Sequence, residues 1–136
     1  MRYTKYDLLD LMNWQNKYNY RLEDRKNILY DLLPKLKTDK LTVLEYYFIT
    51  QSFFNEILNL GNIANDEGNY GNEFTYQFTN DAMIMEEDIY EYYEAYADLG
   101  PKVELMPLPE AKAMASRMIS IYKEAKQWMI KKGYEV

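Results

Sequence analysis

The sequence predicts a mainly α-helical protein: a small helical domain of about five helices, with or without a short two-stranded β element around residues 73–79 and 102–106. Apolar residues recur along most of the chain at the three- and four-residue steps of amphipathic helices. Residues that start and stop helices separate these segments. The length of 136 residues and the hydrophobic content of 48% are sufficient to bury one core, which predicts a single domain over residues 1–136.

Two helices, or one long bent helix, are predicted before residue 40. The first opens at Thr4, with Asp7 three residues later in a capping-box pattern that uses the shorter acid. Its apolar side consists of Leu8, Leu11 and Met12. A second apolar stripe follows at Leu22, Ile28, Leu29, Leu32 and Leu33. Because proline lacks an N–H group and its ring clashes with the preceding turn, Pro34 predicts a helix end or a kink.

A central helix is predicted over residues 41–60. Thr42 and Glu45 form a capping-box pattern at its start. Apolar residues then cover nearly all of its faces: Val43, Leu44, Tyr46, Tyr47, Phe48, Phe53, Phe54, Ile57, Leu58 and Leu60. A helix that is apolar all round belongs in the middle of a fold. Gly61 supplies the expected left-handed stop.

A loop and a strand are predicted next. Residues 61–72 contain three Gly and four Asn, which favour positive φ and turns. Phe74, Tyr76 and Phe78 then alternate with polar residues, as in a strand with one buried face. A weaker alternation within residues 102–106 offers a partner strand, although an isolated two-stranded sheet needs packing support.

Two further helices are predicted in the C-terminal half. The first begins at Thr79 or Asn80, has Asp81 at its positive end, and stops at Gly100 and Pro101. The last begins at Pro109, because proline is favoured in a first helical turn. Its end is predicted from Lys131, Lys132 and Gly133.

The composition removes most catalytic and metal-binding chemistry. The absence of cysteine excludes disulfides, thiolate metal sites and cysteine nucleophiles. The absence of histidine excludes the commonest general base and the commonest metal ligand. The oxygen-rich residues 65–73 do not fit the EF-hand spacing. We therefore expect a non-enzymatic protein without cofactor or metal site, and a carboxylate-dependent enzyme is the least favoured alternative.

Charge is distributed unevenly along a chain of net charge −6. Residues 41–101 contain no Lys or Arg but include twelve Asp and Glu. Within this region, steps of four, three and four residues place one row of carboxylates on a single side of a helix. We call this row the acidic ridge; it consists of Glu87, Glu91, Glu94 and Asp98. Like charges at this spacing repel, so the ridge has a cost for the helix that carries it.

Two interpretations of the acidic ridge are open. In the first, the ridge is a solvated face that helps solubility, and Lys and Arg of the terminal helices form salt bridges with it. In the second, carboxylates and neighbouring tyrosines bind a basic groove that normally holds phosphates. The second interpretation defines a candidate partner-binding site of Glu86, Glu87, Asp88, Tyr90, Glu91, Tyr93, Glu94 and Asp98.

In size, charge layout, lack of His and Cys, and a composition rich in Asn, Lys, Tyr and Ile, the chain resembles a type of small, acidic, mostly helical protein from phages and mobile elements that blocks nucleic-acid-handling enzymes. The resemblance implies an inhibitor of the DNA-mimic, anti-restriction or anti-CRISPR type that occupies the nucleic-acid-binding site of a nuclease or defence effector. The alternative is a helical adaptor or assembly protein that binds a partner, or itself, through an apolar surface of aromatic and methionine side chains.

The expected partner of such an inhibitor is a protein with a basic surface. Direct nucleic-acid binding is not expected, because the chain is acidic overall and has no long basic run. No stretch approaches the roughly 18 apolar residues of a membrane span, so no membrane association and a cytoplasmic location are expected. The other partner that the sequence allows is a second copy of the chain, in a homodimer.

Overall fold

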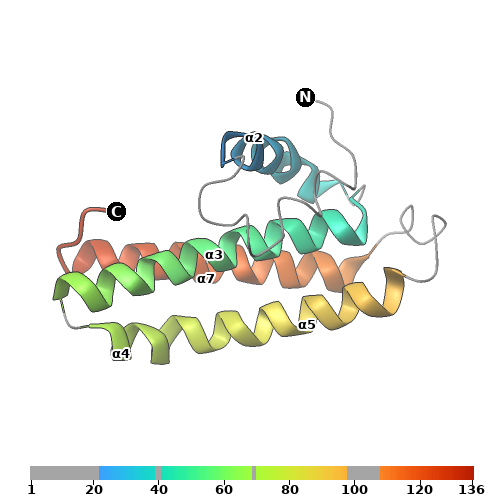
Figure 1. Ribbon diagram of the computed structural model, residues 1–136. Helices are drawn as coiled ribbons and strands as arrows, with labels where there is room; N and C mark the ends of the chain where they lie inside the picture. Colours follow the sequence, from blue (N-terminus) through green and yellow to red (C-terminus); the bar gives the residue numbers. More distant parts are fainter. Residues whose placement is uncertain (1–21, 39–40, 69, 98–107) are drawn as a thin grey trace.

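The computed structural model describes residues 22–38, 41–68, 70–97 and 108–136, and helices make up almost all of this part (Figure 1). In chain order the elements are α2 (Leu22–Leu32), η2 (Leu33–Lys37), α3 (Val43–Gly68), α4 (Gly71–Phe74), η3 (Thr75–Thr79), α5 (Asn80–Ala97) and α7 (Pro109–Lys131). The segment η2 is a 3₁₀ turn, and η3 is a π-helical turn. No strand occurs in these ranges, so the mainly α-helical fold class is confirmed.

Three long helices form the body of the molecule. Helices α3, α5 and α7 pack against one another in all three pairs. Figure 1 shows that α5 runs antiparallel to α3 and that α7 runs in the same direction as α3. Helix α2 packs on α3, and the C-terminal end of the chain lies beside the connection from α3 to α4.

Four of the predicted helices correspond to α2, α3, α5 and α7. The helix predicted from Thr4 and the strand predicted at 102–106 lie outside the described residues, as does the stop at Gly100 and Pro101. The described part therefore contains four of the predicted helices rather than five. Helix α2 ends at Leu32, and the chain continues as a 3₁₀ turn with Pro34 in its first turn, as the proline predicted.

The capping box at the start of α3 is confirmed. The Glu45 amide donates a hydrogen bond to Thr42 Oγ1 (3.1 Å), and the Thr42 amide donates one to Glu45 Oε1 (2.9 Å). These two reciprocal bonds satisfy backbone N–H groups that a helix start leaves without intrahelical partners. They fix the point at which the chain enters the central helix.

Helix α3 is buried on most sides, as its apolar pattern predicted, and it contributes to both halves of the core. One half lies where α2 and the start of α7 meet the first part of α3; it includes Ile28, Leu32, Tyr46, Phe48, Ile89 and Ala111. The other half lies toward the turn between α3 and α4; it includes Ile57, Ala64, Phe74, Phe78, Met118 and Met129. Phe53 packs against both halves and connects them.

The loop predicted at residues 61–72 is wrong over most of its length. Helix α3 passes through Gly61 and ends only at Gly68, and the chain is helical again from Gly71. The glycines serve close packing here. A Cβ on Gly61 would lie 3.1 Å from the Phe74 ring, and one on Gly71 would lie 2.6 Å from the side chain of Asn65. Glycine permits a helix to approach its neighbour this closely.

The strand predicted at residues 73–79 is also wrong. This stretch belongs to a continuous helical run in which α4, the π-helical turn η3 and α5 follow without a break. The aromatic residues do not share one face: Phe74 and Phe78 are buried, whereas Tyr76 is 81% exposed. A four-residue step from Phe74 to Phe78 and then to Ala82 continues the helical core stripe, so the two-residue alternation was misleading.

The end of α7 follows the prediction from its sequence. Pro109 occupies the first turn, and Gly133 has a φ of 95°, which favours glycine. The Tyr134 amide donates to the Met129 carbonyl (3.1 Å), and the Gly133 amide donates to the Ile130 carbonyl (3.0 Å). This pair of bonds is the Schellman motif of helix ends. It turns Tyr134 back toward the last turn of α3.

Candidate protein-binding surface on helix α5

The acidic ridge lies on the side of α5 that faces away from the core. Ala82 and Ile89 on the opposite side are completely buried. With about 100° per residue, all three described ridge carboxylates lie within about 40° of the direction opposite Ile89. These residues, Glu87, Glu91 and Glu94, are exposed. Asp98, the last member of the predicted ridge, lies outside the described residues.

The ridge carboxylates have no cationic partner in the part of the chain that the structure describes. None of Glu87, Glu91 and Glu94 has a described Lys or Arg nitrogen within 4.0 Å. Elsewhere in the same helical run, Glu73 forms an ion pair of 3.9 Å with Lys132. The solvated-face interpretation expected Lys and Arg of the terminal helices to form salt bridges with the ridge. The described lysines of α7 form none with it.

One flank of the ridge contains a cluster of tyrosines that joins α5 to α3. The Tyr47 ring lies 5.9 Å from the Tyr90 ring at 71° and 5.1 Å from the Tyr93 ring at 52°. Tyr47 is buried, Tyr93 is half-buried and Tyr90 is 43% exposed. The edge-to-face contact of Tyr47 with Tyr90 and the tilted contact with Tyr93 hold the rings in defined orientations. Tyr90 therefore lies beside the ridge in an orientation that its contact with Tyr47 holds. Tyr93 belongs mainly to the packing between α3 and α5.

Burial and nearby carboxylates raise the pKa values of tyrosines on this flank. Burial raises the pKa of Tyr47, and the Glu86 carboxylate adds to this effect. A hydrogen bond to Glu94 raises the pKa of Tyr90. Burial raises the pKa of Glu86 as well, followed by repulsion from Glu87. The flank thus combines hydroxyl donors with carboxylate acceptors.

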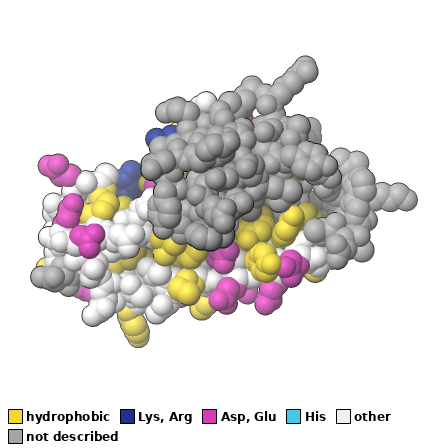
Figure 2. All heavy atoms as spheres, viewed as in Figure 1, with side chains coloured by type: hydrophobic (Ala, Val, Ile, Leu, Met, Phe, Trp, Pro, Cys, Tyr) yellow, Lys and Arg dark blue, Asp and Glu magenta, His cyan; other side chains and the backbone are white. Residues whose placement is uncertain are grey.

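Apolar side chains are exposed among the acids. Along α4, η3 and α5 these are Tyr76, Met83 and Ile84, with exposed fractions of 81%, 46% and 54%. Asp88 is exposed on the flank opposite Tyr90. Figure 2 shows hydrophobic and acidic side chains next to each other along the edge of the molecule that α4 and α5 form. The surface can therefore offer both negative charge and apolar contact area to one partner.

The structure brings together the predicted residues Glu86, Glu87, Asp88, Tyr90, Glu91, Tyr93 and Glu94 on one helix. Sequence reasoning missed Tyr76, which was assigned to a buried strand face, and Tyr47, which was assigned only to the core of the central helix. The step of four residues between Phe74 and Phe78 was the available signal for Tyr76. No local signal identifies Tyr47, because its contact with Tyr90 depends on the packing of α3 against α5.

Among the described residues, no three Asp or Glu side chains are grouped closely enough to hold a metal ion. The described helices include none that has both the length and the apolar character to cross a membrane. Comparisons of the chain with protein-family models, with curated proteins and with solved structures gave no match, so the interpretation of this surface rests on its own geometry.

Proposed function

We propose that the protein is a non-enzymatic inhibitor of phage or mobile-element origin that occupies the nucleic-acid-binding site of a nuclease or defence effector, in the manner of DNA-mimic, anti-restriction or anti-CRISPR proteins. The observation that carries the proposal is the row formed by Glu87, Glu91 and Glu94, which is exposed opposite the core and without a cation among the described residues. Such a row repels itself, and a basic partner relieves that repulsion.

The spacing of the ridge suits a groove built for phosphates. A rise of about 1.5 Å per residue separates Glu87 from Glu91 by about 6 Å along the axis and Glu91 from Glu94 by about 4.5 Å. One strand of B-DNA carries a phosphate about every 3.4 Å along its axis. The linear charge density of the ridge is therefore somewhat more than half that of one strand, which supports competition for a single row of Lys and Arg side chains.

The exposed apolar and aromatic groups extend the same interpretation. Proteins that hold single-stranded nucleic acid combine a basic track with aromatic platforms on which bases stack. Tyr90 lies beside the ridge, and Met83 and Ile84 lie one turn before Glu87. Under this proposal the carboxylates replace phosphates, and these side chains contact the partner's base-stacking positions. Pairing of two copies through this face would oppose carboxylate to carboxylate, which favours a basic partner over a homodimer.

A second candidate function is an adaptor that binds a partner mainly through apolar contact. The observation in its favour is the exposure of Tyr76, Met83 and Ile84 along a single helical run. Apolar association holds or strengthens as salt rises, whereas binding through exposed charges weakens. Salt dependence therefore separates the two functions.

The test is capture of the purified protein on a panel of immobilised nucleases and nucleic-acid-binding effectors at low and at high salt. We expect one effector to retain it at low salt, to release it at high salt and to release it when its own nucleic acid is added. The charge-reversed variant Glu87→Lys/Glu91→Lys/Glu94→Lys should not be retained. Circular dichroism of the variant checks that it remains helical.

The matched control reverses three exposed acids elsewhere and changes the net charge by the same amount; these are Asp66, Glu110 and Glu124. Retention of this control together with loss of the ridge variant assigns binding to the ridge rather than to net charge. Undiminished binding of a folded ridge variant contradicts the proposal. Capture that resists high salt and is lost on Met83→Ser/Ile84→Ser supports the adaptor instead.

A further inference from the structure

Three aromatic rings from distant parts of the sequence meet at the end of the bundle where the chain turns from α3 to α4. Tyr70 precedes α4, Trp128 lies in the last turns of α7, and Tyr134 follows the Schellman motif. The Tyr70 ring lies 6.1 Å from the Trp128 ring at 90° and 6.5 Å from the Tyr134 ring at 80°. Rings set at such angles form the walls of a box rather than a flat stack.

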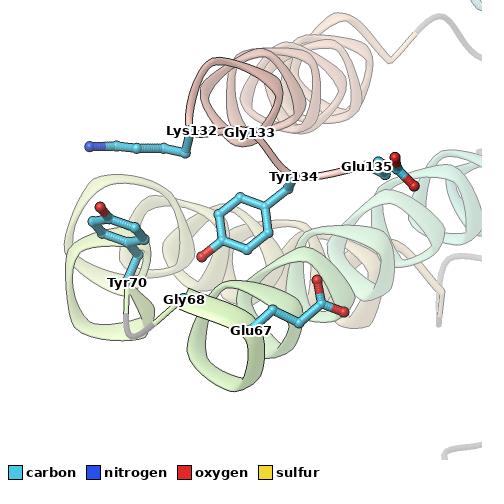
Figure 3. A pocket seen from close by; sticks show the side chains of 7 residues that line it. All are labelled: Glu67, Gly68, Tyr70, Lys132, Gly133, Tyr134 and Glu135. Atoms are coloured by element: carbon cyan, nitrogen blue, oxygen red, sulfur yellow. The ribbon is translucent and has the colours of Figure 1, made fainter.

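A cavity of about 500 Å³ opens beside two of these rings, Tyr70 and Tyr134, and Figure 3 shows the side chains that line it; Trp128 is not among them. In that view Tyr134 points across the cavity toward Gly68, with Tyr70 and Lys132 on one side and Glu67 and Glu135 on the other. The rim thus carries two carboxylates and one ammonium group, and the aromatic faces add further negative potential. These features favour a cationic ligand.

The position of Tyr134 is held by two contacts. Its hydroxyl donates a hydrogen bond to the Ala64 carbonyl (3.2 Å), and burial raises its pKa. Gly68 lies directly under the same hydroxyl, so close that a Cβ on Gly68 would collide with it. A wall that is fixed before binding lowers the ordering cost of a ligand.

The chain already places a cation of its own against this box. Lys132 Nζ lies 4.7 Å from the centre of the Tyr70 ring and 5.3 Å from that of Trp128, both within cation–π range. The same nitrogen lies 3.9 Å from Glu73 Oε1. The Lys132 side chain is 33% exposed, so it can leave for solvent without rearrangement of the helix. A cationic group therefore fits against the faces of Tyr70 and Trp128.

We propose that the faces of Tyr70 and Trp128, at the edge of this cavity, are a binding site for a quaternary ammonium group, such as a trimethylated lysine of another protein, and that Lys132 occupies this position in the free state. A primary ammonium is strongly hydrated, so an ordinary lysine gains nothing over the tethered Lys132. A quaternary ammonium is recognised through the faces of aromatic rings, and this advantage allows it to displace Lys132. Lys132 therefore competes with unmodified lysine for this site and makes the site selective for the quaternary group.

Titration of the full chain with two small probes tests the proposal: Nα-acetyl-trimethyllysine amide and tetramethylammonium chloride. The readout is the indole N–H signal of Trp128 in ¹⁵N NMR spectra, assigned with Trp128→Phe because the chain has two tryptophans. We expect both probes to shift this signal and unmodified Nα-acetyl-lysine amide to shift it far less. Stronger binding of the amide than of tetramethylammonium identifies methyl-lysine as the source; equal binding identifies the free quaternary ammonium.

Variants of the resident lysine and of one wall complete the test. Lys132→Ala removes the internal competitor, so the probes should bind about tenfold more tightly, which corresponds to about 1.4 kcal/mol. The control Lys131→Ala, at an exposed neighbour that does not line the cavity, should bind as wild type does. Tyr70→Leu replaces one wall at a position that is 38% exposed and should abolish the shift while the fold is retained.

Two results would overturn the assignment: no shift in either wild type or Lys132→Ala at millimolar probe, or an unchanged affinity in Tyr70→Leu. Neither readout involves helix α5, so the outcome is independent of the inhibitor function proposed above.

Discussion

Gly61 of α3 faces Phe74 of α4 so closely that a Cβ on the glycine would lie 3.1 Å from Phe74 Cδ1 and 3.2 Å from Cε1. Phe74 is completely buried and is packed with Phe78 and Trp128 at ring distances of 5.2 and 5.8 Å. The ring therefore has little room to move. The absence of a side chain at position 61 is what allows the two helices to approach each other here.

A large side chain at this position should destabilise the fold. Gly61→Leu forces extra methyl groups against Phe74, and overpacking of this kind costs about 1–3 kcal/mol. In Gly61→Ala the gain in helix propensity, about 1 kcal/mol, opposes the displacement of the ring, so the change should be small. Urea unfolding measures both. Asn62→Leu, at the exposed neighbour, is the control and should be close to wild type; equal effects at the two positions would contradict the contact.

The capping box makes a prediction about the stability of α3. Thr42→Ala removes the oxygen that accepts the Glu45 amide and should lower the free energy of unfolding by about 1 kcal/mol. Thr42→Ser keeps a hydroxyl and should lose only a small part of this. Thermal and urea unfolding of the two variants make the comparison. A Ser variant as unstable as the Ala variant would show that the methyl group, not the cap, is responsible.

The raised pKa of Glu86 predicts a pH-dependent effect of its removal. Burial raises this pKa, so the folded state binds the proton more tightly than the unfolded state does. Ionisation therefore costs stability as the pH rises above the usual glutamate pKa of about 4.3, and that cost is absent below it. Glu86→Gln should raise the urea midpoint at pH 7, and the difference from wild type should shrink as the pH falls toward 4.

The control for this experiment is Glu124→Gln, which removes a charge from an exposed position of α7, outside the acidic ridge. Its urea midpoint at pH 7 should stay close to that of wild type. A lower midpoint for Glu86→Gln at pH 7 would mean that the Glu86 carboxylate makes a stabilising contact that outweighs its burial.

The acidic ridge should lower the free energy of unfolding of the protein. Glu91 lies four residues after Glu87 and three before Glu94, so Glu91→Lys converts two repulsive pairs into two attractive ones. Each pair loses a repulsion of about 0.2–0.5 kcal/mol and gains an attraction of similar size, so the total gain in the free energy of unfolding should be about 1 kcal/mol. The gain should shrink in high salt because exposed charges are screened. Thermal unfolding at low and high salt measures it, with Glu91→Gln as the intermediate case.

The same variant links stability to the proposed function. Glu91→Lys should be more stable than wild type and yet lose capture by the basic partner. If Glu91→Lys is less stable than wild type at low salt, the Glu91 carboxylate makes a favourable contact in the free protein. The acidic ridge then does not lower the stability of the fold.

Local chemistry was enough to predict several features of this protein. The start of α3 at Thr42 and Glu45 and the end of α7 at Gly133 depend only on residues within one or two turns. The side of α5 that carries Glu87, Glu91 and Glu94 follows from helical periodicity once the segment is known to be a helix. Such features require no information about the rest of the chain, so the sequence by itself determined them.

Tertiary packing decided the rest. Residues 61, 68 and 71 were predicted to lie in a loop because glycine prefers turns, yet each of these glycines lies where other side chains pack so closely that little or no room is left for a side chain. Burial of Phe74 and Phe78 against Trp128, some 50 residues away, favours a helix over the strand that the alternation suggested. The tyrosine flank of α5 and the box around Lys132 also join distant residues. Contacts between distant segments depend on which helices lie together, and no local pattern encodes that.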